Sequence, residues 1–241
     1  MKKKIVIAKA GGQAREAIVV SLGGSLVAPD SIDIEFLKKF KQSLQKFLNS
    51  KGFIIFVGGG KIARVYQRAL AEFGAKDKGK DLIGIAVSRL NAEVVKNIFG
   101  KTAHKEMIAN PSKNQFGSKK IRNKIIFGSG WKPGWSTDYV SVLSAKANGI
   151  KTIINLTNVD YVYDKNPKEF SDAKPIEKIS WKDFRKIVGN KWIPGLSMPF
   201  DPRASRIAQK LKIKVAIING KNLERLEDFL NNKPFIGTVI Q

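Results

Sequence analysis

Short, wholly apolar segments alternate along this chain with longer segments whose apolar residues recur every three or four positions. The first pattern predicts buried β-strands and the second predicts amphipathic helices. Strands are predicted at residues 17–22, 53–57, 124–127, 151–156 and 215–219, with an edge strand at 235–240. Helices are predicted at residues 34–48, 61–73, 82–99, 137–148, 180–188, 201–211 and 223–230. The alternation predicts an α/β fold, a three-layer αβα sandwich with a central, mainly parallel sheet.

Several helix starts carry residues that suit an N-cap. Ser136 or Thr137 is expected to cap one helix, Ser180 a second, and Asp201, which Pro202 follows, a third. The remaining polar stretches are predicted as loops at residues 101–123, 157–175 and 190–200.

Glycines follow three of the predicted strands. In IFVGGGKIARVYQR, residues 55–68, three glycines separate an apolar run from a helix with cations at Lys61 and Arg64. Glycine lets a backbone approach a ligand closely, and amides at a helix start attract anions. SLGGS at 21–25 and GSGWKPGWSTD at 128–138 repeat the arrangement. Because ligands bind beyond the carboxyl ends of parallel strands, we expect a phosphate site there, with ordinary βα turns as the alternative.

Composition excludes several classes of site. The 241 residues suit one large domain or two small ones, with a soft boundary near Gly149. The chain has no cysteine and a single histidine, His104, so a disulfide framework or thiolate nucleophile is excluded and structural zinc is not expected. The apolar runs are too short to span a bilayer or to form a signal peptide, so a cytoplasmic protein that does not meet a membrane is expected.

The charge is strongly positive. Lys and Arg number 44 against 20 Asp and Glu, which gives a net charge of +24, concentrated in residues 1–15 and 101–124. Such a surface attracts nucleotides and RNA without specificity. We interpret it as a solvated basic surface rather than a specific RNA site, because no RNP-like or zinc-finger spacing occurs. No P-loop or first-strand GxGxxG is present either, so nucleotide binding would need another scaffold.

Two polar segments offer candidate chemistry. Asp138 follows Ser136 and Thr137 at a helix start, and we interpret it as a carboxylate that orients phosphate-binding groups or helps to hold Mg²⁺, with capping as the alternative. TNVDYVYDKNP, residues 157–167, opens at a strand end. It either lines a base and ribose or forms an ordinary Asx and proline loop.

Six segments, taken in order, resemble the amino acid kinase superfamily, and most closely its archaeal UMP kinase branch. They are SLGGS, VGGGKIARVY, DLIGIAVSRLNA, GWKPGWSTD, TNVDYVYDKNP and DPRASRIA. The resemblance covers residues 17–241 and leaves residues 1–16 as a basic N-terminal extension. It implies an acceptor-binding part at about 17–150 and an ATP-binding part at about 151–241.

The resemblance implies that ATP gives its γ-phosphoryl group to UMP, forming UDP in pyrimidine nucleotide synthesis. The acceptor phosphate is already ionised, so catalysis would be in-line positioning and charge neutralisation by Mg²⁺, amides and cations, with no strong general base. No metal ligand is assigned. Proteins of this kind often form hexamers built from dimers, so a homo-oligomer, a trimer of dimers, is expected.

Carried over residue by residue, the resemblance implies three groups of site residues. Catalytic roles fall to Ser21, Gly24 and Asp138. UMP would be held by Gly58, Gly59, Arg64, Asp81 (at the ribose), Gly130, Ser136 and Thr137. ATP would be held by Gly23, Gly24, Ser25, Gly60, Thr157, Asn158, Tyr163 and Asp164.

The chain departs from the family pattern at several positions. Many superfamily members have a lysine two residues before the first glycine, where it stabilises the charge in flight, but this chain has Ser21. Lys61 and Arg203 are candidate substitutes for that cation. Tyr161 stands where the family segment reads TNVDG, and the two basic segments exceed what the resemblance explains.

Alternative functions remain open on the sequence alone. Trp131 and Trp135 either stack on a base or pack internally. A kinase of isopentenyl phosphate, a carbamate or an amino acid would keep the fold and change the pocket. Ser21 favours a further alternative, a non-catalytic nucleotide-binding regulator or storage protein on the same fold. RNA binding through the basic segments would be lost steeply as salt is raised.

Overall fold

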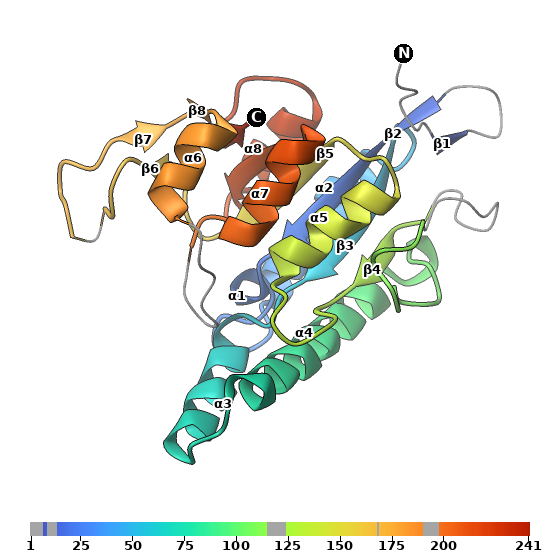
Figure 1. Cartoon of the computed structure of the whole chain (residues 1–241). Helices are drawn as coiled ribbons and strands as arrows, with labels where there is room; N and C mark the ends of the chain where they lie inside the picture. Colours follow the sequence, from blue (N-terminus) through green and yellow to red (C-terminus); the bar gives the residue numbers. More distant parts are fainter. Residues whose placement is uncertain (1–6, 9–13, 115–123, 168, 190–197) are drawn as a thin grey trace.

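One β-sheet runs through the molecule, as Figure 1 shows. The structure is a computed structural model that describes residues 7–8, 14–114, 124–167, 169–189 and 198–241. In spatial order the sheet contains β4 (Ile126–Gly128), β3 (Lys51–Val57), β2 (Ala14–Leu22), β5 (Thr152–Thr157), β9 (Lys214–Asn219), β10 (Thr238–Ile240) and β8 (Lys178–Ile179). Strands β4 to β9 pair in parallel, whereas β10 is antiparallel to β9 and parallel to β8. The mainly parallel sheet is confirmed.

Helices cover both faces of this sheet and complete the three predicted layers. The described helices are α1 (Gly24–Val27), α2 (Ile34–Gln45), α3 (Gly60–Glu72), α4 (Asp77–Phe99), α5 (Thr137–Ala147), α6 (Trp181–Val188), α7 (Pro202–Leu211) and α8 (Leu223–Leu230), with a 3₁₀ turn, η1, at Gly100–Thr102. Apolar residues of α2, α4 and α8 form one core cluster with the sheet, and those of α5, α6 and α7 form the other. Helices α3 and α4 pack together and project beyond the sheet (Figure 1).

The strands are apolar at almost every position because both of their faces are covered. Val20 and Leu22 of β2 lie in the cluster with α2 and α4, whereas Val19 lies in the cluster with α5 and α7. All three side chains are fully buried. A parallel sheet covered on both faces therefore produces the continuous apolar runs seen in the sequence, rather than an alternating pattern.

Helix caps follow the sequence closely. Ser136 accepts a hydrogen bond from the Tyr139 amide at the start of α5, and Ser180 accepts one from the Asp183 amide at the start of α6. Asp201 accepts from the amides at the start of α7, where Pro202 occupies the first turn. These three predicted caps are confirmed.

The differences from the predicted elements lie where the apolar period is weak or the element is very short. Helix α4 begins at Asp77 rather than at residue 82. The prediction missed its first turn because DKGK contains no apolar residue that would mark a helix. The loop predicted at 157–175 contains a small antiparallel pair, β6 (Val162–Tyr163) and β7 (Pro175–Ile176). Helix α1 and strand β8 were also not predicted. Most of the loop predicted at 190–200, and residues 115–123 of the basic segment, lie outside the described residues.

The predicted N-terminal extension partly joins the sheet. Strand β1 (Ile7–Ala8) pairs antiparallel with the beginning of β2, which starts at Ala14 rather than at residue 17. The remaining residues of the extension lie outside the described part of the chain. One continuous sheet runs through both halves of the chain. The division into acceptor-binding and ATP-binding parts near residue 150 stays a prediction.

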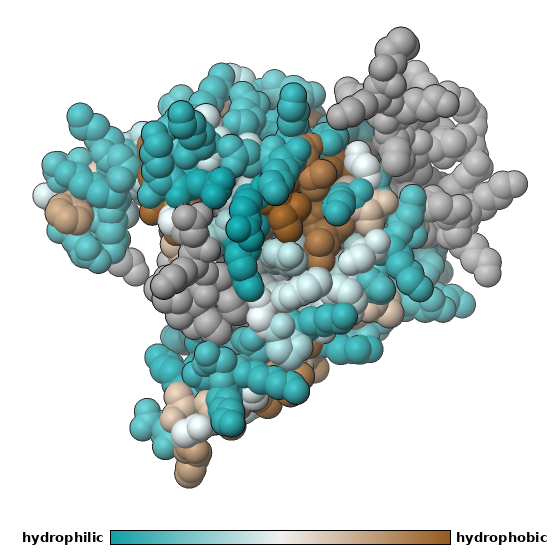
Figure 2. Space-filling view, viewed as in Figure 1, coloured by the Kyte–Doolittle hydropathy of each residue, from teal (hydrophilic) through white to brown (hydrophobic). Residues whose placement is uncertain are grey.

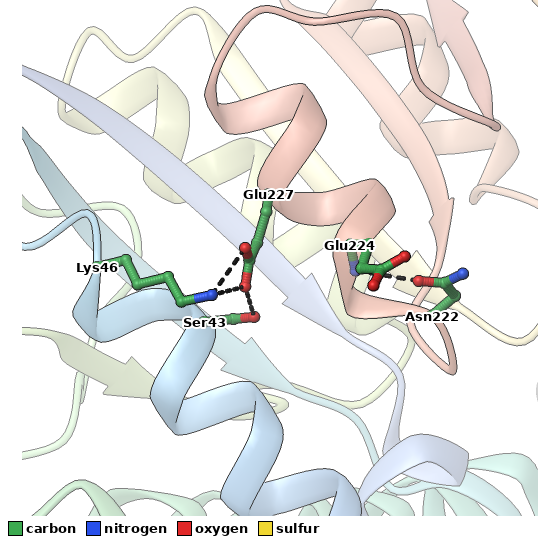
Figure 3. Close-up of polar contacts among 5 residues, drawn as sticks. All are labelled: Ser43, Lys46, Asn222, Glu224 and Glu227. Carbon is green, nitrogen blue, oxygen red and sulfur yellow. Dashed lines mark hydrogen bonds and ion pairs between the residues drawn. The ribbon is translucent and has the colours of Figure 1, made fainter.

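A polar contact joins the second and the last helix of one layer. The Glu227 carboxylate of α8 accepts hydrogen bonds from Ser43 Oγ at 2.6 Å and from Lys46 Nζ at 2.7 and 2.9 Å, as Figure 3 shows. Partial burial raises the pKa of Glu227, but these donors outweigh burial and lower the pKa overall. Glu224, on the same helix, points away from this contact, and its amide is capped by Asn222. The contact therefore fixes α8 against α2.

The face of the molecule drawn in Figure 2 is mostly polar. Figure 2 shows that hydrophilic residues cover most of the side that carries α5 and α7, in keeping with the net charge of +24. Within the described residues, every helix is too short or too polar to cross a bilayer.

Candidate active site

The three glycine loops predicted from the sequence meet at the carboxyl ends of β2, β3 and β4. We call residues 23–25 the first glycine loop, residues 58–60 the second and residues 128–138 the third. The first two pack backbone to backbone: a Cβ at Gly24 would overlap the Gly58 carbonyl, and one at Gly60 would overlap Gly24. Gly60 also has a φ of 65°, which L-residues avoid. No other residue type fits Gly24 or Gly60 without moving the backbone.

A cleft of about 300 Å³ opens above these loops. Every predicted site residue except Tyr163 and Asp164 lines this cleft. The lining residues among the predicted ones are Ser21, Gly23, Gly24, Ser25, Gly58, Gly59, Gly60, Arg64, Asp81, Gly130, Ser136, Thr137, Asp138, Thr157 and Asn158. The carboxyl ends of β2 and β5 and the loops that follow β3 and β4 contribute to it. The topology therefore brings together segments that are more than a hundred residues apart.

Tyr163 and Asp164 do not line this cleft. Asp164 Oδ1 accepts a hydrogen bond from the Lys174 amide at 2.8 Å, and the Tyr163 ring packs edge-on against Tyr161 at 6.4 Å. Tyr161, which departs from the family pattern, is accommodated by this ring contact. A contact of Tyr163 or Asp164 with ATP stays a prediction from the resemblance.

Asp138 forms the floor of the cleft. Its Oδ1 accepts a hydrogen bond from Ser21 Oγ at 2.9 Å, and its Oδ2 accepts one from the Asp201 amide at 3.1 Å. Burial, and next the charge of Asp201, raise the pKa of Asp138 to about 7, although the two hydrogen bonds lower it. Because Ser136 caps α5, the alternative of Asp138 as a capping residue is wrong.

Asp201 lies beside Asp138 and also lines the cleft. Its Oδ1 accepts from the amides of Arg203 and Ala204, and its Oδ2 accepts from Ser136 Oγ at 2.5 Å. Sequence reasoning predicted only its role as a helix cap. The residue therefore links α7 to α5 and places a second carboxylate at the cleft floor.

Polar residues of α4 support the second and third glycine loops. The buried Asn91 side chain donates to the Gly58 carbonyl at 2.9 Å, and Ser88 Oγ accepts from the Gly130 amide at 3.0 Å. Asp81 Oδ2 accepts from the Gly134 amide at 2.5 Å. Sequence reasoning missed Ser88 and Asn91. Their signal is a polar stripe, with Asp81, Ser88 and Asn91 spaced seven and three residues apart on one helix face.

The two cations proposed to replace the missing lysine lie elsewhere. Lys61 is exposed and pairs with Asp30, and the Arg203 guanidinium donates to the Gly134 carbonyl and lies 5.7 Å from the Tyr139 ring centroid. Neither side chain lines the cleft. The sequence also predicted Lys61 beside Arg64 at a phosphate site; of these two residues, Arg64 lines the cleft and Lys61 does not.

The cationic residues that line the cleft, within the described part of the chain, are Arg64 and Lys132. Arg64 Nη2 contacts Ser25 Oγ at 3.2 Å. Lys132 Nζ lies 4.4 Å from the centroid of the Trp131 ring, and Trp131 packs edge-on against Trp135 with 5.1 Å between ring centroids. Trp135 continues the stack onto Tyr139 at 4.9 Å and borders the cleft. The tryptophans therefore pack on one another, and one of them also faces the site.

Known proteins with similar sequences and structures identify the family to which this architecture belongs. The model of the amino acid kinase family matches residues 16–219. The uridylate kinase of Pyrococcus abyssi is 35% identical over 93% of this chain and 99% of its own length, and that of Thermoplasma volcanium is 33% identical over 94% and 98%. The crystal structure of uridylate kinase from Archaeoglobus fulgidus matches with a TM-score of 0.80 and 30% identity, covering 93% of this chain and 99% of its own.

A more distant match concerns the fold alone. The crystal structure of a UMP kinase from Bacillus anthracis has a TM-score of 0.75 at 19% identity, over 94% of this chain and 96% of its own. The sheet order, the converging glycine loops and these matches along nearly the whole length agree with one another. The chain belongs to the amino acid kinase family.

Proposed function

We propose that the protein transfers the γ-phosphoryl group of ATP to UMP and releases UDP and ADP. The observation that carries the proposal is the cleft in which the first and second glycine loops pack backbone to backbone beside Arg64. Backbone amides and a guanidinium hold phosphates without a general base. The uridylate kinases of two archaea, at 35% and 33% identity, support UMP as the acceptor.

The acceptor phosphate would lie at the second glycine loop and Arg64. A guanidinium is a planar fork of donors that matches phosphate geometry. The contact of Arg64 with Ser25 places this cation at the junction of the first and second loops. In-line transfer requires the donor and acceptor phosphates to face each other across the transferred group, and the adjoining loops supply that arrangement.

Asp81 would hold the ribose of UMP, as the resemblance implies. Its Oδ2 accepts from the Gly134 amide, and among the described residues its Oδ1 accepts no hydrogen bond. One oxygen is therefore fixed by the third glycine loop, while the other is available to a hydroxyl in the cleft. Thr157 and Asn158 line the opposite part of the cleft, where ATP is proposed to lie.

We propose that Mg²⁺ binds at the floor of the cleft. Asp138 and Asp201 place two carboxylates side by side, and Mg²⁺ at kinase sites is commonly held by one or two carboxylates together with substrate phosphates. When bound, the ion would neutralise charge on the phosphate oxygens. Ser21 would hold the Asp138 carboxylate in place rather than supply a cation.

A homo-oligomer, built as a trimer of dimers, is also proposed. Apolar side chains are exposed along α3 and α4, and Phe73 between these helices is 90% exposed. The others are Val65, Tyr66, Leu82 and Leu90. Contact with a second copy would remove these side chains from water.

A cytoplasmic location stays a prediction from the sequence.

The experiment that tests the function is a coupled ADP-release assay with ATP, Mg²⁺ and separate acceptors. The acceptors are UMP, CMP, isopentenyl phosphate, carbamate, glutamate and aspartate. Turnover that is highest with UMP is expected. Turnover with a different acceptor would change the substrate class and keep the kinase.

A second candidate function, a non-catalytic nucleotide binder, rests on Ser21, which brings no cation to the position where many family members have lysine. No turnover with any acceptor, in protein that binds UMP or ATP by calorimetry, would favour it.

A further inference from the structure

We propose that Lys132 is a second cation for the acceptor phosphate and acts beside Arg64. This inference rests on the proposed function and names a residue to which neither the sequence nor the family comparison gave a role. Lys132 lies in the third glycine loop, which the sequence pointed to through its glycines and through Ser136, Thr137 and Asp138. The structure adds that this residue borders the cleft.

The loop that carries Lys132 is fixed on both sides. Asp81 of α4 accepts a hydrogen bond from the Gly134 amide at 2.5 Å, and the Arg203 guanidinium of α7 donates to the Gly134 carbonyl. Within the loop, the Trp135 amide donates to the Lys132 carbonyl at 3.2 Å and closes a turn. A loop held from two helices keeps the backbone that carries Lys132 in one place, which favours a preorganised phosphate site.

In the described part of the chain, the contacts of the Lys132 ammonium are with aromatic rings. Its Nζ lies 4.4 Å from the Trp131 centroid and 6.0 Å from the Trp135 centroid. Among the described residues, no carboxylate pairs with it. The ring faces attract the cation but leave its hydrogen-bond donors unused. Lys61, in contrast, is neutralised by Asp30.

Charge balance favours the acceptor phosphate as the partner. A phosphate monoester carries a charge of about −1.5 to −2 at neutral pH, so one guanidinium leaves part of it unneutralised. Lys132 shares its loop with Gly130, which Ser88 of α4 holds, and this loop contacts Asp81 at the proposed ribose site. Lys132 therefore lies in the loop beside the part of the cleft where UMP, rather than ATP, is proposed to bind.

Calorimetric titration of the full chain with UMP, and separately with ATP and Mg²⁺, tests this inference. Lys132→Met is expected to weaken UMP binding by about tenfold, because a charge-assisted hydrogen bond is lost. Affinity for ATP is expected to stay within about twofold. Lys132→Arg should restore most of the UMP affinity. Lys39→Met, which removes an exposed lysine of α2 far along the chain, is the matched control and should leave both affinities unchanged.

Tryptophan fluorescence gives a second readout. When UMP draws the ammonium away from the Trp131 face, the emission of wild-type protein should change, and Lys132→Met should lack that component. Wild-type affinity for UMP in Lys132→Met would overturn the inference and leave the kinase proposal standing. A loss confined to ATP would overturn the assignment to the acceptor. Wild-type protein that does not bind UMP would overturn both proposals.

Discussion

Ser21, at the end of β2, donates a hydrogen bond of 2.9 Å to the carboxylate of Asp138, at the start of α5. Ser21 is only 3% exposed. The position where many family members have a cation is thus occupied by a residue that orients an anion. The cationic residues that line the cleft, among those the structure describes, come instead from other segments, at Arg64 and Lys132.

Asp138→Asn is expected to lower kcat by roughly 10- to 100-fold while the fold is retained. The amide keeps an oxygen for the Asp201 N–H and places its NH₂ against Ser21 Oγ, which can accept. The charge at the cleft floor is lost, but no helix cap is removed, because Ser136 caps α5. Steady-state kinetics and circular dichroism measure the two effects. An unfolded variant would show that Asp138 is structural.

The same carboxyl makes stability depend on pH. Its pKa is raised to about 7 from an ordinary value of 3.8, so the folded protein holds a proton that the unfolded chain releases. The free energy of unfolding should therefore fall as pH rises between about 4 and 7, by up to a few kcal/mol. Denaturant titrations of wild type and Asp138→Asn, without nucleotide, isolate this contribution. Parallel pH profiles for the two proteins would contradict the raised pKa.

Arg64→Ala should raise the KM for UMP by about tenfold or more and change the KM for ATP much less. The guanidinium is proposed to contact only the acceptor phosphate, and a charge-assisted hydrogen bond has about this effect. Initial rates at varied UMP and varied ATP measure both constants. Arg206→Ala, which alters an exposed arginine outside the cleft lining, serves as the control. Equal increases for both substrates would place Arg64 elsewhere.

Gly60→Ala should destabilise the protein by more than Gly74→Ala does. Both glycines have positive φ, 65° and 70°, so both substitutions carry a strain of about 1–3 kcal/mol. Only at Gly60 would the new Cβ also collide with the backbone of Gly24, since Gly74 has open space around it. Thermal unfolding of the two variants compares them. Similar melting temperatures would show that the two glycine loops are not packed together.

The sequence predicted those parts of the site that depend on local pattern. An apolar run followed by glycines is a local sequence pattern, so Gly24, Gly58 and Gly60 can be identified from the sequence alone. The roles of Ser88 and Asn91 depend on which loops α4 meets, and no local pattern specifies that. Lys61 was misplaced for the same reason, because its partner Asp30 lies in another segment.

Product analysis tests phosphoryl transfer from ATP to UMP most directly. The protein would be incubated with ATP, Mg²⁺ and UMP, and the nucleotides separated by anion-exchange chromatography. UDP and ADP are expected in equal amounts, at a rate that falls strongly in Asp138→Asn. ADP without UDP, or no reaction in protein that binds both nucleotides, would contradict it.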